Sequence, residues 1–168
     1  MDRWGRWLMS LGALVAVAAC DPSGQVYEDL RLARLKVGES TEQDVRKLFG
    51  TPYAVRDTGG GKGLVYPLGP EGGHTLLIRI GPDGTYQGRE DLLTRANFQR
   101  ISAGMKRTDV LPVLGPPGRT QEYNLKQETA WEWRFKDGAV ERVFVVMFNA
   151  AGQVISTAVE KPPRIGGG

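Results

Sequence analysis

Val45-Arg-Lys-Leu-Phe-Gly-Thr-Pro52 is a stretch that the chain repeats 65 positions later, as Val110-Leu-Pro-Val-Leu-Gly-Pro-Pro117. In both copies apolar residues fall at positions i, i+3 and i+4 ahead of a glycine, which predicts one face of a short amphipathic helix. Gly50 and Gly115 stand where a helix ends with a residue at positive φ, and the prolines that follow prevent helical continuation. The repeat indicates two tandem units with one fold.

In the first unit, two short helices precede Gly50 and three strands follow it. Leu32 and Leu35 lie three apart among charged residues, which predicts a helix over residues 26–35. Thr41 followed by Asp44 has the spacing of a capping box, with Asp in place of the usual Glu or Gln, for the second helix. The predicted strands are residues 64–68, residues 75–80 and a strand that begins at residue 85.

A glycine-rich segment, Gly59-Gly-Gly-Lys-Gly63, lies before the first of these strands. A Walker phosphate loop needs a glycine where this chain has Arg56, and a Ser or Thr where it has Gly63. We therefore expect a hairpin loop here and no phosphate site.

The second unit repeats the two helices. Phe98 and Ile101 align with the leucines of the first unit and predict a helix over residues 97–101. Pro112 lies inside the second predicted helix, where it removes an amide hydrogen-bond donor. We therefore expect that helix to be short and to begin late, with Thr108 as its N-cap.

The strands of the second unit are more clearly patterned. Residues 129–135 alternate strictly, which places Trp131, Trp133 and Phe135 on one face. Residues 142–148 and 153–159 predict two further strands, and residues 119–128 predict a long loop. The fold class is therefore α+β: two tandem ααβββ units, residues 26–91 and 92–161, each with two short helices packed on a three-stranded antiparallel sheet.

The N-terminus has the features of a bacterial secretory signal over residues 1–19. Two arginines precede an apolar run that is too short to span a bilayer comfortably. Val17-Ala-Ala-Cys20 resembles the lipobox of bacterial lipoproteins, in which the cysteine is acylated and becomes the first mature residue. This resemblance implies that lipidated Cys20 anchors the protein to a membrane, with residues 20–25 as a tether. At the other end, residues 162–168 predict a flexible tail.

Several spacings in the second unit resemble the SmpA/OmlA (BamE-like) family of small outer-membrane lipoproteins. They are Ile101-x-x-Gly-Met105, Val110-x-x-x-Leu-Gly115-x-Pro117, Trp131-x-Trp-x-Phe135 and Val146-x-Phe148-x-x-x-Gly152-x-Val154. The resemblance implies a lipoprotein on the periplasmic face of the outer membrane that binds envelope proteins, the β-barrel assembly machinery among them. Asp21 resembles the retention signal of inner-membrane lipoproteins. The sequence therefore leaves the choice between the inner and the outer membrane undecided. The tandem arrangement is also similar to that of the β-lactamase-inhibitor protein, which implies as an alternative a module that binds an envelope enzyme through an open sheet face.

The amino-acid composition argues against several other functional classes of protein. With one cysteine and one histidine, the chain has neither a disulfide framework nor a multi-histidine metal cluster, and we expect no metal and no cofactor. A net charge of +3 is too small and too evenly spread to indicate nucleic-acid binding. No catalytic set assembles around His74, which we expect to be solvent-exposed or a local hydrogen-bond partner. We therefore expect no enzyme.

The candidate binding face lies on the strands of the second unit. Residues 143–148 are apolar on both faces of their strand, whereas helices cover one face of an antiparallel sheet in a two-layer domain. The other face must be covered by residues 119–128, by the other unit or by a partner. Aromatic residues are enriched both in cores and at interfaces, so the two roles stay open for them. The candidate residues are Trp131, Trp133, Phe144, Val146 and Phe148.

Overall fold

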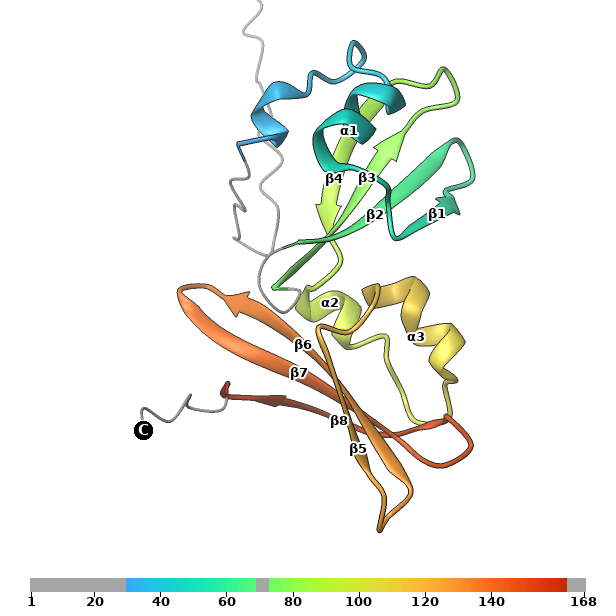
Figure 1. The fold of residues 1–168 in the computed structure, drawn as a ribbon, viewed down its shortest axis with the longest axis vertical. Coiled ribbons are helices and arrows are strands. Elements are labelled where there is room, and N and C mark those ends of the chain that lie inside the picture. Colours follow the sequence, from blue (N-terminus) through green and yellow to red (C-terminus); the bar gives the residue numbers. More distant parts are fainter. Residues whose placement is uncertain (1–29, 69–72, 163–168) are drawn as a thin grey trace, which may run out of the picture.

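The computed structural model describes residues 30–68 and 73–162, which form an α+β fold with two four-stranded antiparallel sheets (Figure 1). In each sheet the strands follow one another in chain order. The elements are η1 (Leu32–Arg34), α1 (Glu42–Phe49), β1 (Ala54–Asp57), β2 (Lys62–Leu68), β3 (His74–Ile80), β4 (Tyr86–Asp91), α2 (Arg95–Phe98), α3 (Arg107–Leu114), β5 (Arg119–Tyr123), β6 (Glu128–Asp137), β7 (Val140–Phe148) and β8 (Val154–Glu160).

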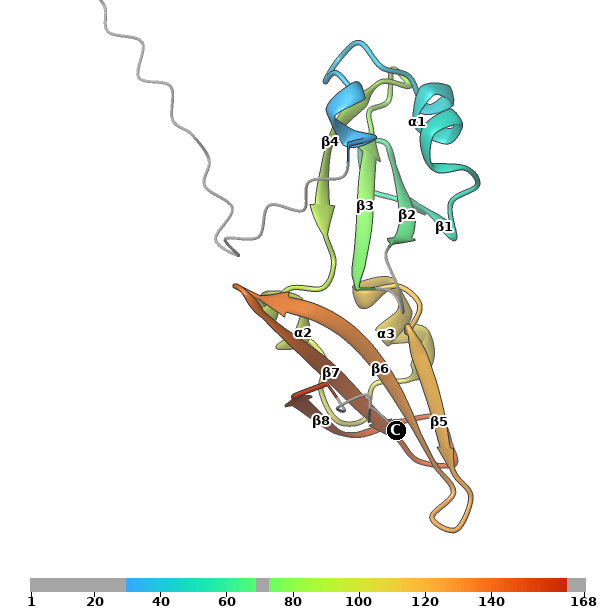
Figure 2. The same cartoon turned by 60° about the vertical axis from the view of Figure 1, so that its left-hand side comes forward.

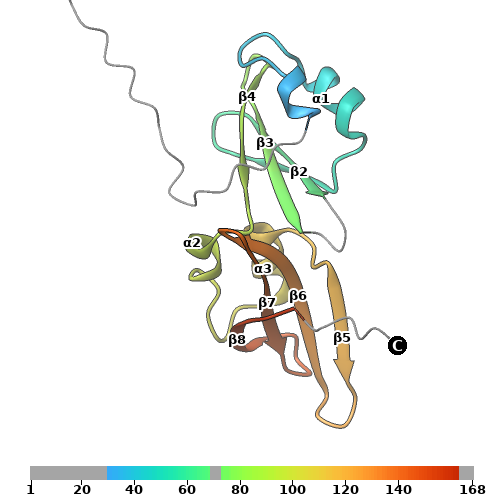
Figure 3. The ribbon, with the colours of Figure 1, turned by 90° about the vertical axis from the view of Figure 1, so that its left-hand side faces the viewer.

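The two sheets are separate and follow each other along the long axis of the molecule (Figures 1 and 2). We call the described residues up to 91 the first unit and residues 92–162 the second unit. Helices η1 and α1 pack on one face of the first sheet. Helices α2 and α3 pack on one face of the second sheet, at the end of that sheet nearest the first unit (Figure 3). The second unit therefore meets the first through its helices.

The two units share one scheme of backbone hydrogen bonds. In the first unit the segment before α1 pairs with the start of β4: the Gly38 amide donates to the Tyr86 carbonyl at 2.9 Å, and the Tyr86 amide donates to the Ser40 carbonyl at 2.7 Å. In the second unit the segment before α3 makes the same two bonds with the start of β8, from Gly104 to Val154 at 2.9 Å and from Val154 to Met105 at 2.8 Å. The repeat seen in the sequence is thus a repeat of backbone structure.

Both predicted ends of the first copy of the repeated helix are confirmed, and so is the C-terminal end of the second copy. The Thr41 amide donates to the Asp44 carboxylate at 3.0 Å and the Asp44 amide donates to the Thr41 hydroxyl at 3.3 Å, which is a capping box. At the other end Gly50 has φ 80°, and in the second unit Gly115 has φ 75°. L-residues with a side chain rarely adopt this backbone conformation, so glycine is needed at both positions.

Two helix predictions need correction. Within the predicted helix of residues 26–35, the described part holds only the single 3₁₀ turn η1. Helix α3 begins at Arg107, with Lys106 and not Thr108 as its N-cap, because the Asp109 carboxylate accepts the Lys106 amide at 2.8 Å. Pro112 consequently lies in the second turn, where it leaves one carbonyl of the first turn without its helical donor.

The prediction of three strands in each unit is also corrected, because each sheet has a fourth strand at its first edge. In the first unit this is β1, which pairs with β2 over four residues. In the second unit it is β5, which occupies much of the predicted loop of residues 119–128 and pairs with β6 from Arg119↔Glu132 to Tyr123↔Glu128. Both strands are short or polar and hold to the sheet through backbone hydrogen bonds, so neither has the apolar alternation that marks a strand in sequence.

Each unit has its own core between the helices and one sheet face. The core of the first unit is mostly aliphatic, and that of the second unit is rich in aromatic residues. The first contains Leu32, Leu35, Val45, Leu64, Tyr66, Leu68, Leu76, Ile78, Ile80 and Tyr86. The second contains Leu93, Phe98, Ile101, Val110, Val113, Leu114, Trp133, Phe135, Phe144, Val146, Phe148 and Val154.

Candidate binding surfaces

The structure places most of the predicted binding face in the core of the second unit. Trp133, Phe144, Val146 and Phe148 are at most 3% exposed and pack beneath the helices, so they are not available to a partner. The expectation of a binding face at these four residues is therefore corrected. Trp131, the fifth candidate, is partly buried against the same core.

The register of β6 and β7 explains this placement. Trp133 lies opposite Phe144, and Trp131 lies opposite Val146, so all four side chains share one sheet face. Because neighbouring residues of a strand point to opposite faces, the other face of β7 carries Val143, Val145 and Met147. Both rows are apolar, and the sequence did not show which of them the helices cover.

The uncovered face of the second sheet therefore has an aliphatic row along β7, and we call this the open face. Helices α2 and α3 pack on the opposite face, where the core of the second unit lies. Val143 is buried, whereas Val145 and Met147 remain partly exposed. On the β8 side Val145 lies opposite Ala158 and Met147 lies opposite Ser156, whereas the buried Val143 lies opposite Glu160.

Charged residues of β6 flank the same row on its other side. Glu132 lies opposite Val145, and Arg134 lies opposite Val143. Their side chains are only 17% and 21% exposed, so they lie along the sheet surface. Glu132 pairs with Arg119 of β5 at 3.8 Å, and Arg134 pairs with Glu141 of β7 at 3.4 Å. The open face thus combines an aliphatic row with an ion-paired border.

The first sheet differs, because the second unit covers part of its outer face. Arg56 in β1 extends its guanidinium to the C-terminal end of α3, where it donates to the carbonyl oxygen of Leu111 at 3.0 Å and to that of Pro112. Both belong to the last turn of the helix, where carbonyls run out of helical donors. The Leu111 carbonyl also accepts the amide of Gly115 at 2.8 Å, so Arg56 is its second donor. Desolvation by burial lowers the pKa of Arg56 from its ordinary value. Arg56 is therefore a helix cap supplied by the other unit.

Gly115 makes the closest approach at this junction. A Cβ atom built on Gly115 would lie 2.6 Å from Cγ2 of Thr75 and 3.6 Å from Cγ1 of Val65, two residues on the outer face of the first sheet. Real Cβ atoms essentially never approach another heavy atom that closely. Gly115 therefore serves two purposes, because it ends α3 at positive φ and it lets the helix end lie against β2 and β3.

His74 lies at the start of β3 and is buried, so the option that it is solvent-exposed is wrong. Its ring nitrogen Nδ1 is 2.8 Å from Oδ2 of Asp91, and Oδ1 of Asp91 accepts the amide of Leu93 at 2.9 Å. The histidine is thus a local hydrogen-bond partner at the point where β4 leads into the second unit. The neighbouring Thr75 hydroxyl has no partner and is fully buried, so it does not complete a catalytic set with His74.

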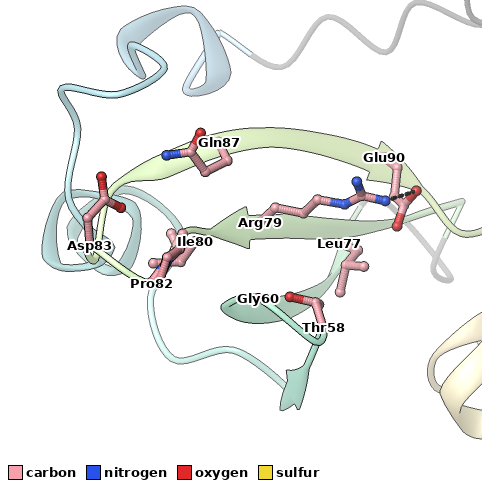
Figure 4. Close-up of a pocket in the computed structure, with 10 residues that line it drawn as sticks. Thr58, Gly60, Leu77, Arg79, Ile80, Pro82, Asp83, Gln87 and Glu90 are labelled. Carbon is pink, nitrogen blue, oxygen red and sulfur yellow. Dashed lines mark hydrogen bonds and ion pairs between the residues drawn. The ribbon is translucent and has the colours of Figure 1, made fainter.

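A shallow groove of 620 Å³ occupies the remaining outer face of the first sheet (Figure 4). Leu77 and Arg79 of β3 form its floor, Glu90 of β4 pairs with Arg79 at 2.9 Å, and the β1–β2 hairpin loop closes one side. This loop is the glycine-rich segment, so the prediction of a hairpin is confirmed. Its Lys62 binds Glu42 at 3.2 Å.

Three further observations concern the described residues alone. In residues 30–68 and 73–162, no three His, Cys, Asp or Glu side chains are placed to hold a metal ion. No helix of this part is long and apolar enough to cross a membrane. Cys20 and Asp21, on which the anchor and the choice of membrane depend, lie outside it, as do residues 163–168 of the predicted tail.

Comparison with known proteins gives structural neighbours only. No protein-family model and no curated protein matches the chain. A putative osmotically inducible lipoprotein, OsmE, is 23% identical with a TM-score of 0.34, and the match covers 36% of this chain and 64% of that one. A putative β-lactamase inhibitor protein from Streptococcus mutans is 14% identical with a TM-score of 0.35, covering 78% and 93%. A DUF4309 family protein (YjgB) from Bacillus subtilis is 16% identical with a TM-score of 0.29, covering 76% and 82%.

These neighbours include a lipoprotein and an inhibitor-like protein, and the chain spans less than two thirds of the length of the former. At these scores the likeness carries no argument about function. The SmpA/OmlA resemblance therefore stays a prediction from the sequence.

Proposed function

We propose that this chain is a lipid-anchored lipoprotein of the bacterial envelope that faces the periplasm. It acts by binding another protein, in outer-membrane protein assembly or in envelope integrity. The anchor rests on Cys20 in its lipobox-like sequence, and the choice of process rests on the family resemblance. The observation that carries the binding role is the aliphatic row on the open face of the second sheet.

The composition of this face suits a protein partner. Specific interfaces have an apolar centre that loses its water on binding and a polar border that stays partly solvated. Val145 and Met147 supply such a centre, and the pairs Arg119–Glu132 and Arg134–Glu141 supply the border. Because the charges of the border already form ion pairs, they fix the orientation of a partner more than they add affinity.

The test is a pull-down of the full-length lipoprotein from its own envelope in mild detergent, with partners identified by mass spectrometry. Val145→Lys places a charge in the centre of the open face, and the expected result is loss of the partner with the melting temperature kept. Val140→Lys is the matched control, because Val140 is 51% exposed on the same strand and both lysines face an acidic residue across β6, Glu132 or Asp137. Equal partner recovery from both variants would contradict a role for the open face.

The anchor has its own test. Cys20→Ser removes the thiol that would carry the lipid, so the variant is expected to leave the membrane fraction while the parent stays in it. A variant that fractionates like the parent would show that Cys20 is not the anchor. Fractionation of the parent between inner and outer membranes shows which membrane holds the protein, and a shift of Asp21→Ser to the other membrane would show that Asp21 acts as a retention signal.

A second candidate uses the same open face for a different partner. An inhibitor-like module would cover an envelope enzyme with this sheet face, as the similarity of the tandem arrangement to that of the β-lactamase-inhibitor protein implies. The same pull-down separates the two candidates. Recovery of barrel-assembly components supports assembly, and recovery of a hydrolase whose activity falls on binding supports inhibition.

A further inference from the structure

The outer edge of β8 differs from the other three sheet edges of the molecule. Exposed edge strands present unpaired backbone groups to other chains, and proteins protect them with charges, short length or irregular backbone. β1 has only four residues and includes Arg56 and Asp57, β4 ends in Arg89-Glu-Asp91, and β5 carries Arg119 and Glu122. β8 begins Val-Ile-Ser-Thr-Ala-Val over residues 154–159 and has no charge before Glu160.

The free part of this edge has defined ends. At its start the outer side of Val154 is already paired with Gly104 and Met105, and Ile155 is an extra residue at a bulge. At its end Pro162 has no amide hydrogen to donate to a further strand. In the described part of the chain no strand pairs with the outer edge between these limits. The regular free run is therefore residues 156–160, and its central residue is Ala158.

We propose that two copies of this chain pair through β8, antiparallel and about a two-fold axis at Ala158. Closed two-fold dimers are the commonest protein assemblies, and their interfaces are self-complementary. Centring the axis on Ala158 uses the whole free run of both copies. The result is a continuous eight-stranded sheet that joins the second units of the two copies.

The side chains along the seam fit this register. On the open face, Ala158 meets its own copy and Ser156 lies opposite Glu160, so no two like charges face each other. On the helix side, Thr157 lies opposite Val159, and pairs of β-branched residues stabilise adjacent strands. Val159 is 47% exposed in the single chain.

A groove next to the edge supports the same arrangement. It has a volume of 340 Å³, lies between α2 and β8, and is lined by Phe98, Ile101, Phe144, Thr157 and Val159 together with Arg95 and Gln99. In the proposed dimer, Val159 of the second copy lies beside Thr157 at this groove. The pairing would thus extend the sheet and cover the exposed side chain of Val159.

Cysteine cross-linking tests the register directly. A stable interface buries about 1,200 Å² or more, and a five-residue edge buries less, so the pairing needs to be trapped. Opposed residues of antiparallel strands have Cα atoms about 4.5–5.5 Å apart, which a disulfide spans. Ala158→Cys in the full-length protein, oxidised in envelope preparations, is therefore expected to give mostly disulfide-linked dimer on a non-reducing gel.

Two controls give the background level of disulfide-linked dimer. Gln87→Cys places a thiol on β4, the equivalent edge of the first unit, and the parent chain with Cys20 alone gives the background. Dimer from Ala158→Cys that does not exceed both controls would overturn the proposal. A second measurement traps differently tagged copies by oxidation, one with Thr157→Cys and the other with Val159→Cys, because the proposed register places these residues opposite each other. This pair is expected to co-purify at least tenfold more than two copies that both carry Thr157→Cys. Equal co-purification of the two pairs would also overturn the proposal.

Discussion

The two units build one backbone scheme from different side chains. Both pair the segment before the second helix with the last strand, and both end that helix with a glycine at positive φ. Their interiors differ. The first core is aliphatic apart from Tyr66 and Tyr86, with Phe49 packed against it, whereas the second stacks Phe98 on Phe144 at 4.2 Å. The comparison teaches that turns and glycines specify the scheme and that apolar volume can fill it in more than one way.

One pair of equivalent positions shows how far the side chains have diverged. Glu42 opens α1 and binds Arg46 at 2.8 Å and Lys62 at 3.2 Å, which ties the helix to β2. Arg107 opens α3, and its guanidinium lies over the rings of Trp131 and Phe148 at 5.6 and 5.3 Å. An ion-pair network in one unit is thus replaced by cation–π contacts in the other.

Helices α1 and α3 also differ in how far their ends depend on residues of the other unit. α1 has a complete capping box and no proline. α3 contains Pro112, and its last carbonyls are capped by Arg56 of the first unit. We infer that the second unit depends on the first more than the first depends on the second.

The largest expected effect is in the aromatic core. Trp133→Ala removes a fully buried indole and is expected to lower the free energy of unfolding by about 3–5 kcal/mol, from lost burial and the cavity left behind. Urea denaturation measures it. Trp131→Ala, on the same strand face but partly exposed, should cost less. Equal costs would mean that the core of the second unit is not centred on Trp133.

The two helix-ending glycines offer a matched comparison. Gly50→Ala meets no atom within 4 Å and adds only backbone strain, on the order of 1–3 kcal/mol. Gly115→Ala adds the same strain and an overlap with Thr75, for a total of about 2–5 kcal/mol. Thermal unfolding of both variants gives the difference. A larger loss at Gly50 would contradict the close approach of α3 to the first sheet.

The next largest effect is expected at Arg56, which caps α3 from the first unit. Arg56→Ala removes the side-chain donor to the Pro112 carbonyl and one of the two donors to the Leu111 carbonyl, and it is expected to cost about 1–2 kcal/mol, as for partly buried hydrogen bonds to a charged group. Hydrogen exchange should show faster exchange of the α3 amides with α1 unchanged. Arg79→Ala is the control, because its ion pair with Glu90 is exposed and lies within one unit. Faster exchange in α1 alone would disprove the proposed dependence.

The smallest effect is a pH dependence confined to the first unit. The hydrogen bond from Arg46 is the main cause that lowers the pKa of Glu42 from its ordinary value. A carboxyl with a lowered folded-state pKa stabilises the fold above its unfolded pKa, and this contribution is lost as the pH falls through the folded pKa. The stability difference between the parent and Glu42→Gln should therefore be largest near neutral pH and shrink below pH about 4. A difference that grows on acidification would contradict the assignment.

Much of the local structure was predictable because it depends on neighbours in sequence. The capping box of Thr41 and Asp44, the glycines that end both helices and the strict alternation of residues 129–135 all follow from periods and spacings, and the structure confirms them. The tandem repeat was visible for the same reason. β1 and β5 were missed because edge strands are held by backbone bonds, which the side-chain pattern does not report.

The candidate binding surface depended on tertiary structure. The sequence by itself determined that β7 has two apolar rows, that residues alternating along it share a face, and that Trp131 and Trp133 lie together. Only the pairing of β6 with β7 and the packing of α2 and α3 decided that Phe144, Val146 and Phe148 face the core and that Val145 and Met147 face outward. The physical reason is that a period of two assigns residues to faces, whereas long-range packing decides which face is buried.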